Sequence, residues 1–240
     1  EPAGLLELQS MALRRAWSEL AQAADTYRTA YPDTVGSDRA EYWSAEAAFR
    51  TDDRATARAS FERLAERGAG ADEGWGAMIP LRLAQLASRD ERWDDAQKSA
   101  LAARAADPQG RRAHEIDYLL GRVAAARAEF TVARQHYENV VRSTAGQGTE
   151  TAAMAQWMIG ESWFHQERWS EAIDAYRSVD PFVAHPRWRA SAVLQIGKCH
   201  ERQGETRSAA AAYARLLREF PASEAAAEAS SRLAALGSSQ

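Results

Sequence analysis

One spacing of residue types recurs five times along the chain and constrains its fold more than any other feature. A small residue is followed twelve positions later by an alanine, and sixteen positions later by an aromatic residue or another alanine. The small residues, which we call the markers, are Ala45, Ala84, Gly121, Gly160 and Gly197. Two antiparallel helices pack closely only where small side chains cross, and an aromatic ring one turn along fills the space beside them. The spacing therefore predicts a series of helical hairpins at intervals of 37 or 39 residues.

The other two positions of each copy repeat as regularly as the marker. The alanines are Ala57, Ala96, Ala133, Ala172 and Ala209. The third positions hold Phe61, Ala100, Tyr137, Tyr176 and Tyr213. One hairpin buries little apolar surface and forms a core only by stacking on its neighbours. A chain of 240 residues with 45% apolar residues has enough apolar surface for such a stack. The expected fold class is all-α, an α-solenoid of about five hairpins.

The chain before the first hairpin is expected to form one long helix over residues 5–31. Leu6, Leu13 and Leu20 are spaced seven apart and define a narrow apolar face. Pro32 ends the helix. Two interpretations stay open: a helix that covers the first hairpin, or a coiled-coil face that joins two copies of the chain into a homodimer.

The end of the chain is expected to form a capping helix. The stretch ASEAAAEASSRLAALG is rich in helix-forming alanine, and Gly237 is its stop signal. A stack of hairpins needs such a lid over its last apolar face. The expected organisation is therefore an N-terminal helix and turn over residues 1–37, followed by the array with its capping helix over residues 38–240.

Composition argues against several classes of partner. The net charge of −4 gives no electrostatic reason to expect binding to nucleic acid. No apolar run approaches the roughly 20 residues that a spanning helix needs, so direct membrane insertion is not expected. Cys199 is the only cysteine, which rules out an internal disulfide and leaves the compartment open.

Nothing in the sequence predicts a catalytic, metal or cofactor site. The five histidines lack the i, i+4 spacing of a helical metal pair, and no HExxH motif occurs. Cys199 stands beside His200, but adjacent helical residues point about 100° apart, so the two cannot share a proton unaided. We therefore expect no enzyme activity, no bound metal and no cofactor.

The last copies of the pattern resemble a known repeat. Gly197, Ala209, Tyr213 and Pro221 match the small residue, alanine, aromatic residue and closing proline of the tetratricopeptide repeat. The resemblance covers about residues 38–236 and weakens toward the first copy. It implies a right-handed superhelix of hairpins that binds protein partners and catalyses no reaction.

The final stretch is also similar in style to the ends of bacterial cell-envelope members of this family, those that serve the Tol-Pal system and outer-membrane barrel assembly. It runs from Ile196 to Gly237. This similarity favours the periplasm or the cell envelope as the compartment, with the cytoplasm as the alternative. It implies no particular partner.

The resemblance also implies where a partner binds. In this family the first helix of each hairpin lines a concave groove, and three positions face it: three residues before the marker, one after it and four after it. Aromatic and charged side chains there are the usual anchors of a protein interface. Those expected to contact a partner are Tyr42, Glu46, Phe49, Tyr118, Arg122, Trp157, Glu161, Phe164 and Lys198. The alternative is that these side chains pack between neighbouring first helices.

Side-chain recognition of a folded or helical protein segment is favoured over capture of a peptide backbone. Relatives that clamp a terminal carboxylate or hold an extended backbone use groove asparagines, and Asn139 is the only asparagine here. The expected function is a protein-binding scaffold in a bacterial envelope assembly. Two alternatives stay open: a structural oligomer joined through the N-terminal helix, or the docking or regulatory part of a larger protein. The latter rests on the first residue being Glu1 and not methionine.

Overall fold

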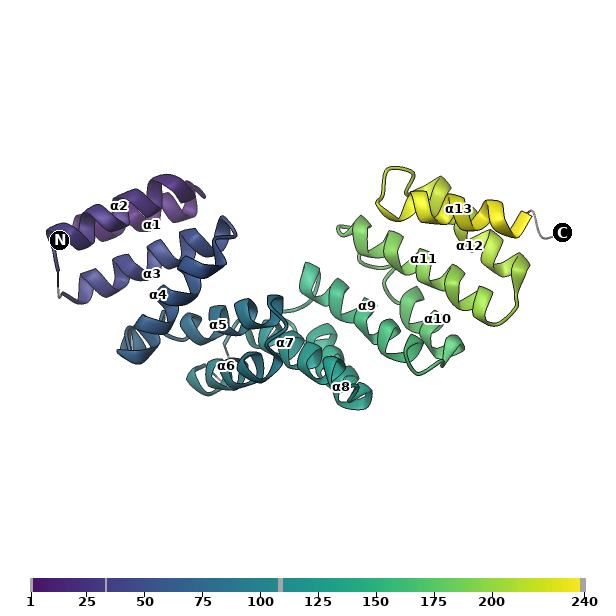
Figure 1. The fold of residues 1–240 in the computed structure, drawn as a ribbon, viewed down its shortest axis with the longest axis horizontal. Helices are drawn as coiled ribbons and strands as arrows, with labels where there is room; N and C mark the ends of the chain where they lie inside the picture. Colours follow the sequence, from purple (N-terminus) through teal and green to yellow (C-terminus); the bar gives the residue numbers. More distant parts are fainter. Residues whose placement is uncertain (1, 33, 108–109, 238–240) are drawn as a thin grey trace. The chain divides into compact units, whose positions relative to one another are not determined.

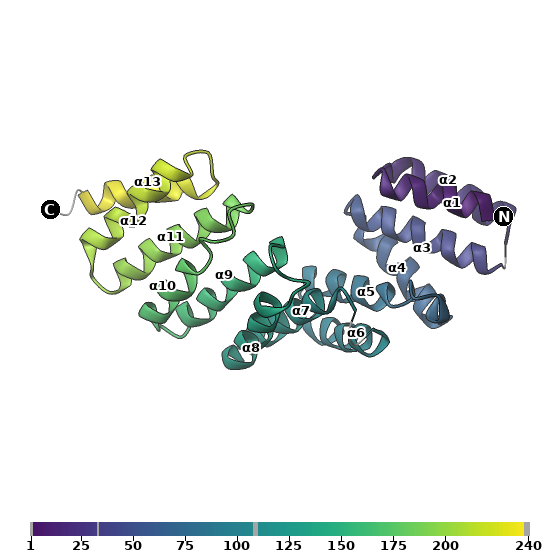
Figure 2. The ribbon, with the colours of Figure 1, turned by 180° about the vertical axis from the view of Figure 1, so that it is seen from behind.

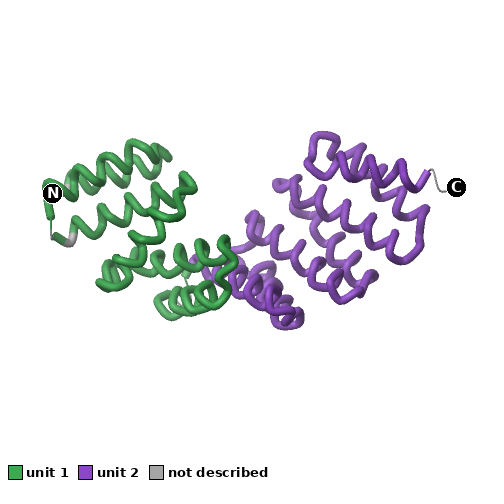
Figure 3. Tube along the Cα trace, in the orientation of Figure 1, with its two compact units in different colours: residues 1–110 green, residues 111–240 purple. Residues whose placement is uncertain are grey.

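The computed structural model describes residues 2–32, 34–107 and 110–237, and it divides into two compact units (Figure 3). Unit 1 is residues 1–110 and unit 2 is residues 111–240. Within the described ranges the regular structure is entirely helical, with thirteen α-helices and one short 3-10 helix. The all-α repeat fold predicted from the sequence is confirmed.

Consecutive helices of each unit pair into antiparallel hairpins (Figure 1). In unit 1, α1 (Pro2–Leu13) pairs with α2 (Trp17–Ala30), α3 (Val35–Arg50) with α4 (Arg54–Glu66), and α5 (Met78–Arg89) with α6 (Trp93–Ala106); η1 (Ala71–Glu73) lies between α4 and α5. In unit 2, α7 (Ala113–Ala126) pairs with α8 (Phe130–Arg142), α9 (Glu150–Phe164) with α10 (Trp169–Arg177), and α11 (Pro186–Arg202) with α12 (Thr206–Glu219). The last helix, α13 (Ala225–Gly237), packs on α12 as the expected cap.

All the hairpins turn with the same backbone geometry. The second helix begins nine residues after the marker position, and the residue two before its start has a positive φ. These left-handed residues, with φ between 56° and 75°, are Arg15, Asp52, Glu91, Ala128, Glu167 and Gly204. The next amide donates to a carbonyl five residues earlier, as Asp53 does to Ala48 at 2.9 Å. This ending stops the first helix and sets the register of the second.

The single helix predicted over residues 5–31 is wrong, because the chain reverses in its middle. Arg15 takes a φ of 59°, which ends α1 and lets α2 begin at Trp17. No proline or glycine marks this turn in the sequence, so it carries no conventional stop signal. The result is a sixth hairpin that precedes the five predicted ones.

This first hairpin follows the register of the others with other residue types. Leu8 occupies the marker position, Leu20 lies twelve residues on and Ala24 sixteen, and all three are buried. Trp17 begins α2 nine residues after Leu8, just as an aromatic residue begins α6, α8 and α10. That spacing was the available signal for the extra hairpin.

The apolar face predicted to run through Leu6, Leu13 and Leu20 is therefore not continuous. Leu20 is 0% exposed inside the first hairpin, whereas Leu6 and Leu13 on α1 are 66% and 79% exposed. The reversal between the helices removes the sevenfold spacing on which the face depended. Leu20 therefore cannot be part of a surface that joins two chains.

The predicted marker pattern forms the core of the remaining hairpins. The markers and both of their partner positions are buried in every one of the five copies. In unit 2 each marker is a glycine on which a Cβ atom would lie 2.2–2.5 Å from a tyrosine ring. The pairs are Gly121 with Tyr137, Gly160 with Tyr176, and Gly197 with Tyr213. Glycine is required there because the ring fills the space of any side chain.

The boundary between an N-terminal segment and the array, predicted after residue 37, stays a prediction. α2 and α3 share one apolar cluster that includes Leu20, Ala24 and Ala40. The first hairpin thus packs on the second, as the second packs on the third within unit 1.

Candidate partner-binding face

Three of the nine residues predicted to contact a partner lie in unit 1, and all three are buried. Tyr42, Glu46 and Phe49 of α3 are 6%, 4% and 7% exposed. The Tyr42 ring packs against the rings of Phe61 and Trp75, with centroids 6.1 and 5.1 Å apart. Side chains of their own and the following hairpin cover them in this structure. Their role in contacting a partner stays a prediction.

Glu46 and Phe49 instead join α3 to α5. The Glu46 carboxylate accepts hydrogen bonds from Nε and Nη2 of Arg82 at 2.7 and 2.8 Å, and from Nε of Arg50 at 2.8 Å. Arg82 is itself only 4% exposed. The guanidinium carbons of Arg82 and Arg89 lie 4.7 and 4.9 Å from the centre of the Phe49 ring. A buried ion pair and cation–π contacts therefore fill this position in unit 1.

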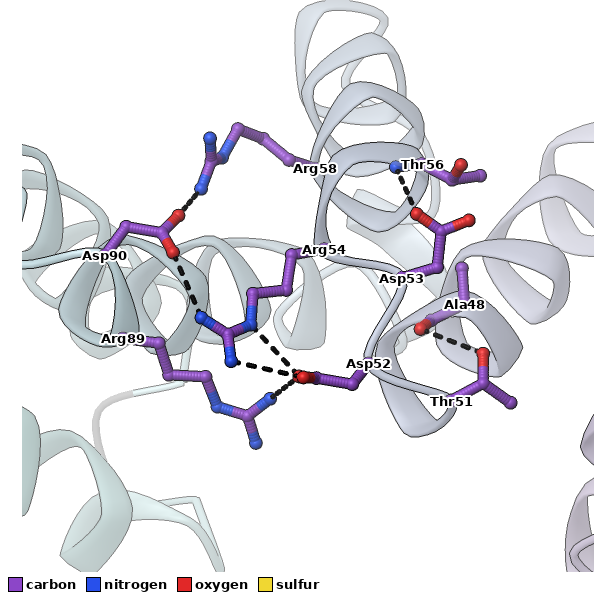
Figure 4. A network of polar contacts seen from close by, with 9 residues as sticks. All are labelled: Ala48, Thr51, Asp52, Asp53, Arg54, Thr56, Arg58, Arg89 and Asp90. Atoms are coloured by element: carbon purple, nitrogen blue, oxygen red, sulfur yellow. Dashed lines mark hydrogen bonds and ion pairs between the residues drawn. The ribbon is translucent and has the colours of Figure 1, made fainter.

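A second polar network joins the turns of the same two hairpins (Figure 4). Asp52 accepts hydrogen bonds from Arg54 at 3.0 Å and from Arg89 at 3.2 Å. Asp90 accepts from Arg54 at 3.4 Å and from Arg58. No spacing of residue types marks this network in the sequence. The side chains of Asp52 and Arg54 are exposed, so the network connects the two turns at the surface of the protein.

In unit 2 the first helices α7, α9 and α11 lie side by side, and α13 lies beside α11 (Figures 1 and 2). The six predicted residues on these helices are all half-buried: Tyr118, Arg122, Trp157, Glu161, Phe164 and Lys198. We call these six residues the first-helix face of unit 2. Unlike their counterparts in unit 1, they keep part of their surface in solvent. Their role in binding a partner stays a prediction.

Three of the six residues of the first-helix face are aromatic: Tyr118, Trp157 and Phe164. The Trp157 ring lies 5.7 Å from that of Trp188, and the Tyr118 ring lies 5.9 Å from that of Tyr137. Phe164 meets the indole that begins α10 edge-on at 4.9 Å. These tilted and edge-on contacts hold the rings of Trp157, Tyr118 and Phe164 in place, and all three residues stay half-buried.

Glu161 is the acidic centre of the face. Its Oε1 accepts hydrogen bonds from the Tyr176 hydroxyl at 2.5 Å and from the Gln195 amide at 2.7 Å. Burial raises the pKa of the Glu161 carboxyl, while these two hydrogen bonds and the charge of Lys198 work in the opposite direction. The Glu161 carboxylate therefore connects α9 with α10 and α11 through hydrogen bonds within the chain.

The capping helix ties down the charged end of the face. Glu201 Oε1 accepts a hydrogen bond from the Tyr213 hydroxyl at 2.6 Å, and Glu201 Oε2 accepts one from Arg232 Nη1 of α13 at 2.8 Å. Lys198 forms an ion pair with Glu228 of α13 at 2.8 Å. Lys198, although predicted as a contact residue, thus has an acidic neighbour within the chain.

Three buried polar atoms at this face have no hydrogen-bond partner among the described residues. They are the Tyr137 hydroxyl, Trp157 Nε1 and Gln195 Oε1. A buried donor or acceptor without a partner loses about 1–3 kcal/mol relative to its hydrated state. The sequence singled out Trp157 through its place in the repeat. Tyr137 and Gln195 were missed, because residue spacing does not show which hydroxyl or amide lacks a partner.

Three further observations concern metal binding, a nucleophilic cysteine and membrane-spanning helices. In the part of the chain that the structure describes, no group of His, Cys, Asp or Glu is arranged to hold a metal. Cys199 is fully buried, and burial raises the pKa of its thiol to about 12, which makes it a poor nucleophile. The neighbouring His200 pairs instead with Glu205 at 2.7 Å. None of the described helices combines the length and apolar character needed to cross a membrane.

The fold is similar to those of several solved proteins. PilW, described as a widely conserved type IV pilus biogenesis factor, has a TM-score of 0.71 at 16% identity over 95% of this chain and 96% of PilW. PilF of Pseudomonas aeruginosa has a TM-score of 0.67 at 15% identity over 96% of each chain. YrrB, described as a TPR protein with an unusual peptide-binding site, has a TM-score of 0.58 at 14% identity over 88% of this chain and 99% of YrrB. At these identities the likeness concerns the fold.

Sequence comparison identifies the family. No curated protein matches the chain. A family model described as a tetratricopeptide repeat matches residues 191–223. A second model, described as a tetratricopeptide repeat-like domain, matches residues 6–160, which is more than half of the chain and includes the hairpin that the sequence pattern missed. The chain therefore belongs to the tetratricopeptide repeat-like family.

Proposed function

We propose that the chain is a non-enzymatic scaffold that binds a folded or helical protein segment on the first-helix face of unit 2. The observation that carries this proposal is the set of three unpartnered polar atoms among half-buried aromatic rings. Tryptophan, tyrosine and arginine dominate protein interfaces because they bury much area for few rotatable bonds. The tetratricopeptide repeat-like family, which is typical of protein–protein interaction scaffolds, supports the same role.

The test uses a display library of a three-helix domain with randomised surface residues, selected on the full chain. Binders are expected to lose about tenfold or more in affinity when Arg122→Ala or Trp157→Phe is introduced. Trp157→Phe keeps a ring but removes the indole donor. Val132→Ala, at an exposed position on α8, is the matched control and should leave the affinity unchanged. Binders that ignore both face variants, with helical content intact by circular dichroism, would overturn the proposal.

We further propose that the partner belongs to a bacterial cell-envelope assembly. The similarity of residues 196–237 to envelope members of the family supports this, as does the likeness in fold to PilW, which is described as a type IV pilus biogenesis factor. Fractionation of cells that produce the tagged protein from its full reading frame is expected to place it in the periplasm or the envelope. Recovery in the cytoplasm alone would contradict the proposal.

Self-association through α1 is a second candidate function. It rests on Leu6 and Leu13, which lie one heptad apart on α1 and are 66% and 79% exposed. Light scattering is expected to show a dimer that the double substitution Leu6→Ser and Leu13→Ser converts to a monomer. A monomeric unsubstituted chain at high concentration would remove this candidate.

A further inference from the structure

The outward side of α1, the first helix of unit 1, carries a stripe of exposed small and apolar side chains (Figure 1). Leu6 and Leu13 are 66% and 79% exposed. Ala3 and Ser10 are exposed on the same side of the helix, because residues three, four and seven apart share a face. Leu8, on the opposite side, is buried in the first hairpin. We call the four exposed residues the α1 stripe, and it points away from the core.

The other helix of the same hairpin shows how unusual this stripe is. Outermost hairpins of a helical array normally keep a polar outer face. The exposed residues of α2 follow that rule: Ser18, Glu19, Gln22, Asp25, Thr26, Thr29 and Ala30. Two leucines exposed one heptad apart on such a hairpin are typical of a surface that packs on another helix.

Two charges of opposite sign lie beside the α1 stripe. Glu7 and Arg14 each follow one of the exposed leucines by one residue, so both lie on the same flank of the stripe. The Arg14 amide donates to the Ser10 carbonyl at 3.1 Å, which keeps Arg14 in helical register. Both side chains are exposed, and neither has an ion pair or a side-chain hydrogen bond among the described residues. The flank therefore carries two charges that are not matched within that part of the chain.

A second copy of α1, packed antiparallel, matches both the leucines and the charges. When Leu6 of one copy faces Leu13 of the other, two-fold symmetry repeats the contact at the other end of the helix pair. The same symmetry sets identical flanks side by side, so Glu7 of each copy lies beside Arg14 of the other. A parallel pair would instead set this flank against the opposite one, which carries Gln9.

We propose that the chain forms a symmetric homodimer in which two α1 helices pack antiparallel, with Leu6 against Leu13 and Glu7 paired with Arg14 across the two-fold axis. This inference rests on the candidate self-association through α1, and it adds the orientation of the partner and the charges that select it. The partner is a second copy of the chain, because α1 itself supplies both complementary charges at matching positions. No residue of the first-helix face of unit 2 takes part.

The small size of the contact predicts a weak dimer. α1 has 12 residues, which corresponds to a length of about 18 Å. Two helices of this length bury less than the roughly 1,200–2,000 Å² of a standard protein interface. The dissociation constant is therefore expected in the micromolar range. It should rise with salt concentration, because the Glu7–Arg14 pairs are exposed to solvent.

The first arm of the test reverses one charge at a time in the full chain. Glu7→Arg and Arg14→Glu each convert both ion pairs of the dimer into like-charge contacts, and each should weaken the dimer about tenfold. Glu62→Arg makes the same charge change at an exposed position on α4 and is the matched control, which should leave the dissociation constant unchanged. Sedimentation equilibrium at low salt measures all four proteins.

The second arm mixes the two single variants. In a mixed dimer of Glu7→Arg with Arg14→Glu, one contact joins the two substituted side chains and the other joins the two native ones, so both are attractive. The mixture should therefore dimerise with about the affinity of the unsubstituted chain, although each variant alone does so poorly. Recovery in the mixture also shows that both variants are folded. Sedimentation with one variant fluorescently labelled measures the mixed dimer.

The outcomes separate this inference from the self-association on which it rests. A monomeric unsubstituted chain, or a dimer that survives Leu6→Ser with Leu13→Ser, would overturn both. A dimer that this double substitution abolishes, but that tolerates both charge reversals or is not recovered in the mixture, would overturn the antiparallel pairing and leave self-association through α1 standing. Loss with each single variant and recovery in the mixture support both.

Discussion

The two units close their hairpins with the same backbone register but with different side-chain pairs. In unit 1 the pairs are Leu8 with Ala24, Ala45 with Phe61, and Ala84 with Ala100. In unit 2 a glycine faces a tyrosine in every hairpin. Close packing constrains the combined volume of the two side chains where the helices cross more strongly than it constrains either residue alone. The repeat is therefore a constraint on pairs of residues, which a search for one residue type at a time only partly detects.

The residue pair that closes each hairpin determines which polar groups of the second helix lie beside the first helix. The pairs of unit 1 carry no hydroxyl, whereas each tyrosine of unit 2 brings one through the hairpin. Unit 1 instead places a complete ion pair, Glu46 with Arg82, between its first helices. Among the described residues, unit 2 leaves the Tyr137 hydroxyl and Trp157 Nε1 without partners, and unit 1 leaves Trp43 Nε1 and Ser88 Oγ without partners on its own first helices. The units therefore differ in the buried ion pair and in the tyrosine hydroxyls, and not in the presence of unpartnered polar atoms.

The largest effect is expected from breaking the ion pair of unit 1. Glu46→Ala leaves the Arg82 guanidinium buried without its carboxylate, which should lower the free energy of unfolding by roughly 3–5 kcal/mol. Urea denaturation of the full chain, with hydrogen exchange to locate the loss in residues 34–107, measures the effect. A loss confined to unit 2 would contradict the assignment.

A matched double variant separates the ion pair from the packing. Glu46→Leu with Arg82→Leu removes both charges and keeps apolar volume, and replacing a whole buried ion pair in this way is often close to neutral. The double variant should therefore recover most of the stability lost in Glu46→Ala. If it is as unstable as the single variant, the position depends on shape and not on charge pairing.

The glycine–tyrosine pairs of unit 2 should give the next largest effect. Gly160→Ala places a Cβ atom 2.4 Å from the Tyr176 ring, and such overpacking should lower the free energy of unfolding by about 1–3 kcal/mol. In a Tyr176→Ala background the same substitution should cost nothing, because the ring is gone. A double-mutant cycle by urea denaturation measures the coupling, and additive effects would contradict the packing argument.

Much of the fold was accessible to sequence reasoning because five copies of the pattern place small residues where helices cross. The first hairpin was missed for a physical reason: Leu8 and Ala24 invert the usual order, with the large residue on the first helix. Arg15 adopts a positive φ although it is not a glycine. The amide of Ala16, which follows it, still donates a hydrogen bond to the Met11 carbonyl in α1. Trp17 and Ala24 kept the spacing of the other hairpins, nine and sixteen residues after Leu8.

The candidate site was accessible in part. The repeat places Trp157 and Tyr42 at the same position, yet Tyr42 is buried by Trp75 from the connection that precedes α5, and Trp157 remains half-buried. The spacing of residues within one hairpin does not show which side chains of the neighbouring hairpin pack against it. For the same reason, the unpartnered hydroxyl of Tyr137 became apparent only when the three hairpins of unit 2 were compared in space.

Two carboxylates, Glu161 in unit 2 and Glu41 in unit 1, should affect stability with opposite dependence on pH. Burial raises the pKa of Glu161 in unit 2 above its ordinary value of 4.5. The native state then holds the proton more tightly than the unfolded state, so stability falls as the pH rises from 4.5 through the native pKa. Burial acts the same way on Glu41 in unit 1, but hydrogen bonds from Arg67 and Arg63 outweigh it and lower the pKa. Stability from Glu41 is present above 4.5 and is lost as the pH falls through the native pKa.

Two glutamine variants isolate these contributions. Relative to Glu161→Gln, the unsubstituted chain should lose stability as the pH rises above the ordinary value of 4.5. Relative to Glu41→Gln, it should lose stability as the pH falls below that value. Urea midpoints of the three proteins between about pH 3 and pH 7 measure both differences. Differences of the same sign would refute the contrast between the two carboxylates.

The smallest effect is expected at the hairpin turns, where the units agree. Glu91 in unit 1 and Ala128 in unit 2 hold φ values of 56° and 59°, which strain any residue except glycine. Glu91→Gly and Ala128→Gly should each raise the free energy of unfolding by about 0.5–1 kcal/mol, because relief of strain exceeds the added freedom of the unfolded chain. Gly204→Ala should lower it by about as much. Urea denaturation measures these changes in the free energy of unfolding. Equal increases for Glu91→Gly and Ala128→Gly would show that the two units share one turn and differ only in the pairs that close their hairpins. Unequal increases would show that the turn also differs.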